Sequence, residues 1–200
     1  MADALHDLLL RFPHVPARAE ILHRAAQADE YDLFGLVPAD KVDPAALRRR
    51  FLALSRVTHP DAAASEDPSV QRDMAALSAR VNQAYETLRD PILRAESLLT
   101  RAGGPSAAED KRVPPELLAE LLEVREELDA AHAAGDAAAM ALILDDIASR
   151  HDAERDRAMD LAARLAAGDA SLRDALRLSL NALRYLATVR SQGRALQSSP

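Results

Sequence analysis

A histidine and an aspartate two positions apart, His59 and Asp61, have the clearest capacity for chemistry in this chain. An imidazole beside a carboxylate can act as an acid–base pair or supply two ligands to a metal ion. With Pro60 between them, the same residues can also form a turn in which Asp61 accepts backbone hydrogen bonds, the usual role of such a tripeptide. The other five histidines are scattered, without a His-Glu-x-x-His motif. Catalysis and metal binding are therefore the weaker interpretations.

Arginines precede this tripeptide in a window that contains no acidic residue. Residues 44–58 hold four arginines, and helical spacing turns Arg48, Arg49 and Arg56 away from the apolar side. Most charge runs are solvated surfaces. Here nothing within the window neutralises the charge, although the whole chain has a net charge of −7. The pattern favours an acidic partner, and the overall charge argues against general nucleic-acid binding.

Composition excludes further classes of protein. The chain has no cysteine, which removes disulfides, thiolate metal sites and cysteine nucleophiles. No apolar run approaches the roughly 20 residues that span a bilayer, and the first residues do not resemble a signal peptide. No nucleotide or cofactor motif is present. We therefore expect a soluble, cytoplasmic protein without a cofactor.

The elements that position these residues are expected to be helices. Alanine and leucine dominate, whereas Val, Ile and Thr together number only 17, which predicts an all-α fold. Asp-Pro pairs, in which aspartate caps a helix and proline occupies its first position, predict helix starts at 44, 68 and 91. Gly-Asp pairs at 135–136 and 168–169 predict a stop followed by a new start.

These signals divide the chain into two helical domains. We expect weak helices within 1–30, a short helix near 31–35, and strong helices at 44–58, 68–89, 91–101, 115–133, 136–167 and 169–191. The polar, Gly- and Pro-containing segment 102–113 is typical of a linker. The predicted organisation is an N-terminal extension (1–30), a domain built on a helical hairpin (31–101), the linker, and a three-helix bundle (114–200).

The helices at 44–58 and 68–89 should form an antiparallel hairpin, because a short loop connects their apolar faces. Proline disfavours the α conformation in the residue before it, so the first helix should end near Thr58. The tripeptide His59-Pro60-Asp61 would then lie at the tip of the hairpin, directly beyond the basic helix.

Four motifs in order give this region a family resemblance: Tyr31-Asp32-Leu33-Phe34-Gly35-Leu36, the basic helix, His59-Pro60-Asp61, and Asn82-Gln83-Ala84-Tyr85-Glu86-Thr87-Leu88-Arg89-Asp90-Pro91. Residues 31–100 resemble a J-domain, the module that activates the ATPase of DnaK-type chaperones. The resemblance implies chaperone contacts by His59, Pro60, Asp61, Arg48, Arg49 and Arg56. Thr58 stands where an aromatic residue is usual, and Ala62 where a basic one is usual.

The helix at 115–133 carries a second apolar stripe beside its core stripe. The core stripe is Leu117, Leu121, Val124, Leu128 and Ala131. Leu118 and Leu122 lie off that stripe, and residues 116–129 hold six acids against one arginine. They could be additional core, but the acidic surroundings favour an exposed patch for a partner. The last helix has a similar second stripe (Leu178, Ala182, Tyr185 and Val189), and Tyr185 could serve either a partner surface or the core.

The presence of both domains in one sequence narrows the resemblance to one group of J-domain proteins. The run from Leu117 to Asp129, together with Arg94-Ala95-Glu96-Ser97-Leu98-Leu99, resembles the HscB family of co-chaperones of iron–sulfur cluster biogenesis. In that family the J-domain engages the chaperone HscA and the C-terminal bundle binds the scaffold IscU. The resemblance implies scaffold contacts by Leu118, Ala119, Leu122, Glu123, Glu126 and Tyr185, with Ala119 smaller than is common.

The resemblance implies an adaptor rather than an enzyme. Such a protein stimulates the ATPase of an HscA/DnaK-type chaperone and delivers an IscU-like scaffold to it. The alternative is a general J-domain co-chaperone whose C-terminal helices bind an unrelated client. Some eukaryotic relatives carry a cysteine metal site before the J-domain, which the absence of cysteine excludes here.

Overall fold

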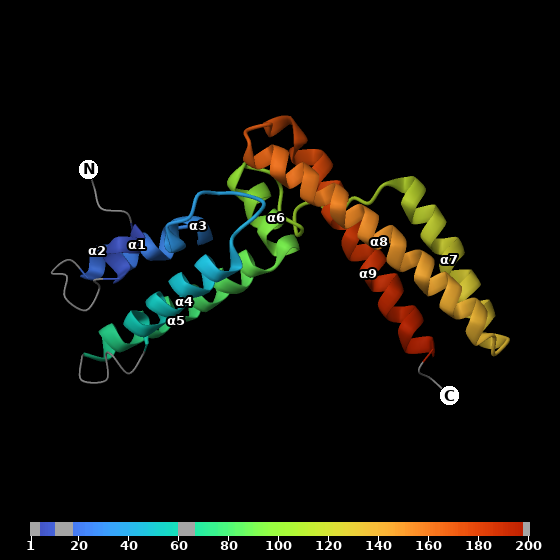
Figure 1. The fold of residues 1–200 in the computed structure, drawn as a ribbon, viewed down its shortest axis with the longest axis horizontal. Helices are drawn as coiled ribbons and strands as arrows, with labels where there is room; N and C mark the ends of the chain where they lie inside the picture. The colour runs from blue at the N-terminus through green and yellow to red at the C-terminus, as the bar shows by residue number, and fades with distance from the viewer. Residues whose placement is uncertain (1–4, 11–17, 60–66, 198–200) are drawn as a thin grey trace. The chain divides into compact units, whose positions relative to one another are not determined.

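The computed structural model describes residues 5–10, 18–59 and 67–197, and every secondary-structure element in those ranges is helical. The all-α prediction is thereby confirmed. The chain divides into two compact units, Met1–Arg101 and Ala102–Pro200 (Figure 1). The first unit contains α1 (Leu5–Leu10), α2 (Arg18–Gln27), α3 (Glu30–Phe34), α4 (Pro44–Thr58), α5 (Pro68–Arg89) and α6 (Pro91–Arg101). The second contains α7 (Pro115–Ala133), α8 (Ala137–Ala166), the 3₁₀ helix η3 (Ala170–Leu172) and α9 (Arg173–Gln197).

Aspartates cap three helices of the first unit, as the Asp-Pro pairs predict. Asp43 accepts a hydrogen bond from the amide of Ala45 at 2.9 Å, and Asp67 accepts one from the amide of Ser69 at 2.8 Å. Asp90 caps α6 through bonds from two successive amides. Because amides in the first turn have no partner within the helix, each aspartate satisfies groups that would otherwise be left to water.

The helices α4 and α5 form an antiparallel hairpin, side by side in Figure 1. Each buries one face, and the buried residues are Leu47, Leu54 and Thr58 of α4 and Met74, Leu77, Val81, Ala84 and Leu88 of α5. Phe51 of α4 stacks on Tyr85 of α5 with ring centroids 4.2 Å apart. Apolar residues at spacings of three and four thus fix the pairing of the two helices.

The N-terminal helices α1 and α2 pack within the first unit. Leu9 of α1 and Ala25 of α2 are completely buried. Arg80 of α5 donates hydrogen bonds to the carbonyls of Ala25, at 2.9 Å, and of Ala28. Carbonyls at a helix C-terminus lack helical partners and attract a cation, so this arginine holds the end of α2 against α5.

The second unit is a bundle of three long helices. Gly135 and Gly168 adopt positive φ angles of 67° and 107°, a conformation that only glycine reaches at little cost, and they allow the chain to reverse between successive helices. Arg150 of α8 pairs with Glu120 of α7 at 2.7 Å. Ser179 of α9 donates to a carboxylate of α8 at 2.5 Å. These contacts place successive helices antiparallel, as the short turns predict.

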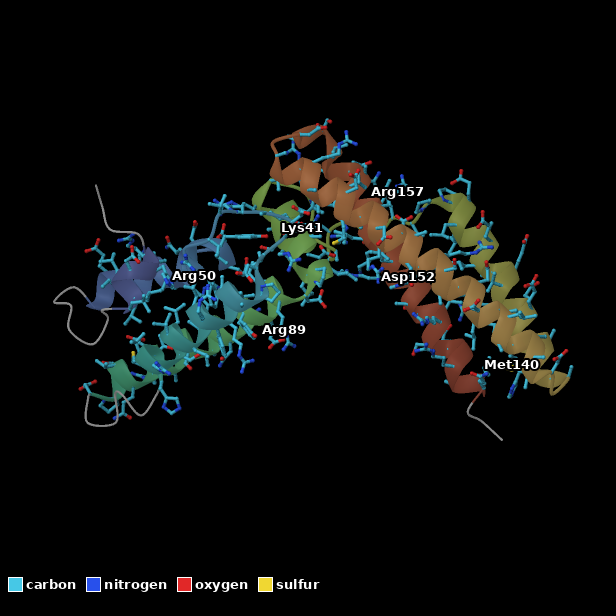
Figure 2. All side chains as sticks on the ribbon, viewed as in Figure 1. Lys41, Arg50, Arg89, Met140, Asp152 and Arg157 are labelled. Atoms are coloured by element: carbon cyan, nitrogen blue, oxygen red, sulfur yellow. The ribbon has the colours of Figure 1, made fainter. Side chains whose placement is uncertain are left out.

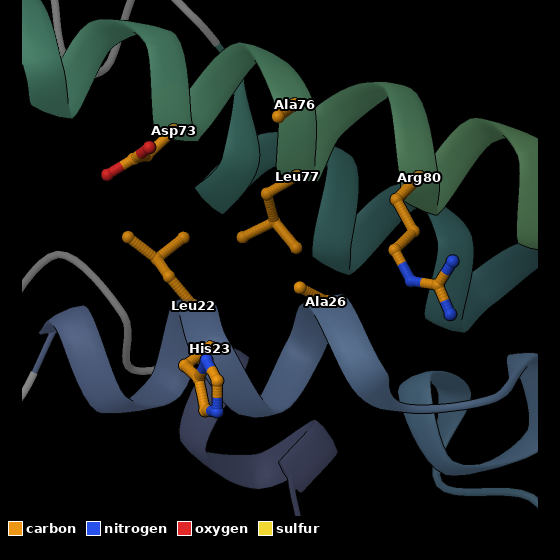
Figure 3. Close-up of a pocket in the computed structure, with 7 residues that line it drawn as sticks. All are labelled: Leu22, His23, Ala26, Asp73, Ala76, Leu77 and Arg80. Carbon is orange, nitrogen blue, oxygen red and sulfur yellow. The ribbon is translucent and has the colours of Figure 1, made fainter.

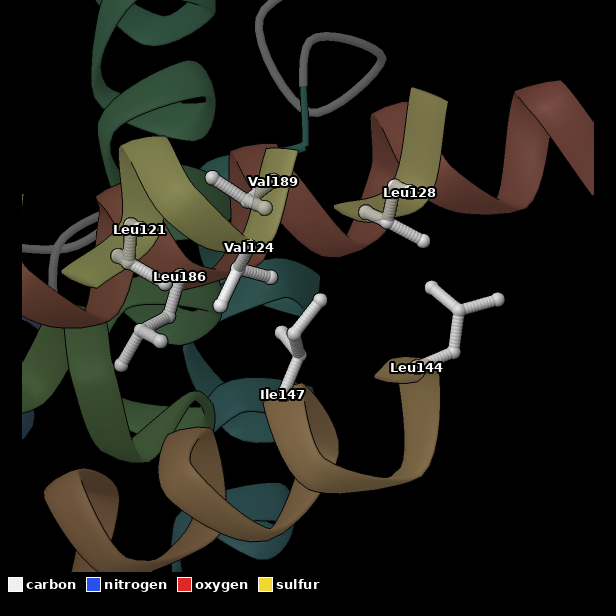
Figure 4. Close-up of a cluster of buried hydrophobic side chains, with 7 residues drawn as sticks. All are labelled: Leu121, Val124, Leu128, Leu144, Ile147, Leu186 and Val189. Carbon is white, nitrogen blue, oxygen red and sulfur yellow. The ribbon is translucent and has the colours of Figure 1, made fainter. Parts of the chain in front are cut away.

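The core of the bundle is a cluster of aliphatic side chains from all three helices (Figure 4). Its buried members are Leu121, Val124 and Leu128 of α7, Leu144 and Ile147 of α8, and Leu186 and Val189 of α9. Leu117, Ile143 and Tyr185 pack against the cluster while remaining partly exposed. The core stripe expected on the helix at 115–133 therefore faces the bundle interior.

The segment between α6 and α7 is tied to α9. The side-chain amide of Asn181 donates to the carbonyls of Asp110 at 3.0 Å and Arg112 at 2.8 Å. Arg112 in turn hydrogen-bonds the carboxylate of Asp110 and lowers its pKa to about 2. The buried guanidinium of Arg177 donates to Asn181 at 3.1 Å. The composition of residues 102–113 is that of a linker, but they lie within the second unit.

The last helix differs from its predicted span of 169–191. Asp169 accepts a bond from the hydroxyl of Ser171 and makes no cap to a helix amide, so the chain first forms η3. At the other end α9 continues through Gly193, where a glycine would be expected to weaken it. A Cβ at that position would lie 2.7 Å from Leu144 and 3.0 Å from Leu128. Glycine here allows α9 to pack closely against the core.

Candidate protein-interaction surfaces

Three arginines, Arg48, Arg49 and Arg56, form an exposed basic face on α4. No carboxylate among the described residues forms an ion pair with them. The fourth arginine of this helix, Arg50, points elsewhere and donates to the carbonyl of Phe34 at 2.7 Å (Figure 2). Arg50 thus caps α3 and does not belong to the basic face.

His59 lies at the C-terminal end of the basic helix. It is exposed and has extended backbone angles (φ −62°, ψ 134°), so it terminates α4. This conformation fits the restriction that a following proline imposes on the residue before it. Pro60 and Asp61, predicted to act with His59, lie outside the described residues, as does Ala62.

Thr58 occupies a core position immediately before the tip. Its side chain is completely buried, and its hydroxyl donates to the carbonyl of Leu54 at 3.0 Å, one turn earlier. The threonine that stands where an aromatic residue is usual therefore faces inward. It supports the end of the helix and does not belong to the exposed surface around His59.

One apolar residue lies among the arginines of the basic face, and the charge pattern of the sequence did not reveal it. Leu52 is 44% exposed, although Leu47 and Leu54 of the same helix are buried. Its spacing of four residues from both Arg48 and Arg56 could have shown it, because residues four apart are neighbours on a helix surface.

The second candidate surface is an acidic–apolar face on α7, made of Leu118, Ala119, Leu122, Glu123 and Glu126. All five side chains are exposed, with Leu118 at 40% and Leu122 at 50%. On the same helix Leu121, Val124 and Leu128 are buried in the core. The helix thus presents apolar groups on two sides, and the side that faces solvent is bordered by carboxylates.

Tyr185, the remaining residue predicted for scaffold binding, is partly buried on α9. Its ring packs against the aliphatic core cluster and keeps some exposure. Ala182 and Val189, which share its stripe, are almost completely buried. Two residues of that stripe are therefore core, whereas Leu178 and Tyr185 keep partial exposure.

A groove of about 400 Å³ lies between α2 and α5 of the first unit (Figure 3). Its walls carry Leu22, His23, Ala26, Asp73, Ala76, Leu77 and Arg80. His23 contacts Gln27 at 3.1 Å, and Arg80 holds the carbonyls at the end of α2. Arg80 therefore joins the two helices, whereas His23 bonds within α2, and the polar groups of the groove do not converge on a substrate.

The described part of the chain contains no group of three or more His, Asp or Glu residues that could hold a metal ion. It also contains no helix long and apolar enough to cross a membrane. The chemistry that the two faces can perform is recognition: cations on one unit and carboxylates around leucines on the other.

Comparison with known proteins gives a family match within the second unit and similar solved structures for most of the chain. Residues 113–192 match the family described as the HSCB C-terminal oligomerisation domain. The structure is similar to the chaperone HscB from Vibrio cholerae, with a TM-score of 0.68 and 26% sequence identity over 84% of this chain and 96% of that one. The human co-chaperone HscB has a similar fold, with a TM-score of 0.67, 23% identity, and 84% and 82% of the two chains covered. A likeness over 84% of the chain extends into both units.

Proposed function

We propose that the two units of this HscB-type co-chaperone bind different partner proteins. The first unit is a J-domain that stimulates the ATPase of an HscA/DnaK-type chaperone. The second unit binds an IscU-like iron–sulfur scaffold protein and delivers it to that chaperone in the cytoplasm. The observation that carries this proposal is the exposed acidic–apolar face of α7 within the matched family domain.

The chaperone contact would begin with electrostatic attraction. Arginines on the basic face, without carboxylate partners among the described residues, draw an acidic surface of the chaperone toward α4. His59, with the adjacent Pro60 and Asp61, would then make the contact that triggers ATP hydrolysis inside the chaperone. The catalytic groups belong to the chaperone, so this chain acts as an activator and not as an enzyme.

The scaffold contact would rest on apolar burial bordered by charge. Leu118 and Leu122 offer apolar surface that the bundle leaves exposed, and Glu123 and Glu126 lie beside them on the same side of α7. An apolar centre with a polar rim is the usual anatomy of a protein interface. Tyr185 would add a partly rigid aromatic contact at the edge of the bundle.

The proposal is tested by measuring ATP hydrolysis by the purified HscA-type chaperone of the same organism. Addition of this chain should accelerate hydrolysis, and addition of the scaffold with it should accelerate hydrolysis further. Acceleration without any effect or binding of the scaffold would favour the alternative, a general J-domain co-chaperone with an unrelated client. No acceleration at all would contradict the assignment of the first unit.

A further inference from the structure

Leu52 lies at the middle of the exposed side of α4. At about 100° per residue, Leu52 points to the side opposite the buried Leu47 and Leu54. Arg48 precedes it by four residues and Arg56 follows it by four, which makes both of them its neighbours on the helix surface. A leucine with 44% exposure therefore sits inside a rim of guanidinium groups.

The fold does not require leucine at this position. Arginine and glutamine have helix propensities close to that of leucine, so a polar residue would serve the helix equally well. A single exposed leucine is ordinary on a protein surface. Leu93 of α6 is similarly exposed, at 45%. Leu52 differs from it because the neighbours of Leu52 are the arginines of the basic face.

We infer that Leu52 is the apolar anchor of the chaperone-binding surface and that the chaperone presents an apolar recess bordered by carboxylates. This inference rests on the proposed function and specifies the chemistry of the partner. The arginines attract the acidic border at long range, and their strength depends on salt. Leu52 contributes only at contact, where burial of its apolar surface inside a charged rim adds to the affinity.

The salt dependence of chaperone binding separates the contribution of the arginine charges from that of the apolar contact of Leu52. Exposed charges are screened over about 8–10 Å near physiological ionic strength. Burial of apolar surface is not weakened by moderate salt. Loss of Leu52 should therefore weaken binding by a similar factor at every salt concentration, whereas loss of an arginine should matter less as salt rises.

The test uses full-length Leu52→Gln and the matched control Leu93→Gln, titrated against the purified HscA-type chaperone at two salt concentrations. Glutamine removes the apolar contact without changing charge or helix propensity. We expect Leu52→Gln to bind about five- to tenfold more weakly at both salts, as loss of roughly half a leucine contact implies. Leu93→Gln should bind like wild type.

A charge-reversed variant, Arg48→Glu with Arg49→Glu, separates failure of this inference from failure of the proposed function. If this variant loses binding and Leu52→Gln binds within twofold of wild type, the basic face is the chaperone site and Leu52 is not its anchor. If wild type itself does not bind the chaperone, the proposed function fails and the inference fails with it. Circular dichroism of each variant establishes that the helices are intact.

Discussion

At the scale of single residues, exposed and buried side chains alternate over a few positions of the chain. Thr58 is buried and bonded to the preceding turn, whereas His59, the next residue, is exposed and ends the helix. Arg49 and Arg50 divide in the same way, one on the basic face and the other bonded to the end of α3. Adjacent residues of a helix point in different directions, so neighbours in sequence serve different purposes.

Replacement of His59 by glutamine should abolish stimulation of the chaperone ATPase without unfolding the first unit. The position is exposed, and changes at such positions usually alter the free energy of unfolding by less than about 0.5 kcal/mol. ATPase measurements and the helical circular dichroism of the same sample test both parts. Full stimulation by His59→Gln, or loss of its helical signal, would count against the proposed role.

His6 gives the first unit a stability that depends on pH. Its side chain is buried, with Nδ1 3.3 Å from the carbonyl oxygen of Leu33. Burial lowers the pKa of His6, and the nearby charge of Arg50 lowers it further, against opposing contributions from the Leu33 carbonyl and Asp7. The unfolded chain then binds a proton at His6 more readily than the folded one. The contribution of His6 to stability is therefore fully present above about pH 6.5 and is lost as pH falls below it.

The expected result is a lower melting temperature of the first-unit transition at pH 5.5 than at pH 7.5. The matched variant His6→Gln, which cannot titrate, should show a smaller difference between the two pH values, whatever its absolute stability. An equal pH dependence in wild type and His6→Gln would assign the effect to other groups.

At the scale of elements, α7 carries apolar residues on two sides, only one of which is buried. The side with Leu121 and Leu128 is buried in the bundle, and the side with Leu118 and Leu122 remains exposed. α9 carries two apolar stripes as well; in the second, Ala182 and Val189 are buried, whereas Leu178 and Tyr185 keep partial exposure. Both helices pack against the other two, so the sequence pattern and the number of neighbours do not decide whether a second stripe is core; the extent of each contact does.

The double variant Leu118→Ser with Leu122→Ser should lose scaffold binding and keep a folded bundle. We expect a loss of about 1–2 kcal/mol in unfolding free energy, mainly from the lower helix propensity of serine and the partial burial of both leucines. By comparison, Leu121→Ala should cost about 2–5 kcal/mol, since Leu121 is completely buried. Thermal unfolding and titration with the scaffold test the two effects on one sample.

A variant elsewhere on the same unit serves as the binding control. Leu142 on α8 is 74% exposed, so Leu142→Ser removes a comparable apolar group away from the acidic–apolar face. This control should bind the scaffold like wild type. Unchanged binding by the Leu118 and Leu122 variant would place the client site elsewhere, and a large fall in its melting temperature would show that these leucines stabilise the core.

Element boundaries could be predicted where a local residue determines them. Asp43 and Asp136 cap helices through their own side chains, so the signal lies within a few residues of the helix start. The roles of Arg50 and Asn181 could not be predicted, because the backbone carbonyls to which they donate lie 15 or more residues away. Likewise, composition marks 102–113 as a linker, but its contacts come from α9, far along the chain. The basic face was predicted from charge, whereas its apolar member Leu52 required the exposure of each side chain.

At the scale of the whole molecule, each unit folds around its own core and carries its own candidate surface. Buried leucines of α4 and α5 stabilise the first unit, and the aliphatic cluster of α7, α8 and α9 stabilises the second. Neither surface contributes residues to the other core. A variant can therefore remove one interaction and leave the second intact, which makes the dependence of each on the other measurable.

We expect the scaffold to increase ATPase stimulation only when the chaperone-binding and scaffold-binding surfaces are on the same chain. We expect that His59→Gln, which keeps the acidic–apolar face, cannot be complemented by the Leu118→Ser, Leu122→Ser variant, which keeps the tip of α4. A tether between two binding sites raises their effective concentration, commonly to the millimolar range, and a mixture of separate chains lacks this gain. At micromolar protein the mixture should show the stimulation due to the intact tip alone.

An excess of His59→Gln should also compete for scaffold and reduce the scaffold-dependent stimulation by wild type. The measurement is the ATPase rate of the chaperone with a fixed amount of scaffold and varied ratios of the two variants. Full scaffold-dependent stimulation by the mixture would show that the two interactions act through separate chains, and the adaptor proposal would be wrong in its central step.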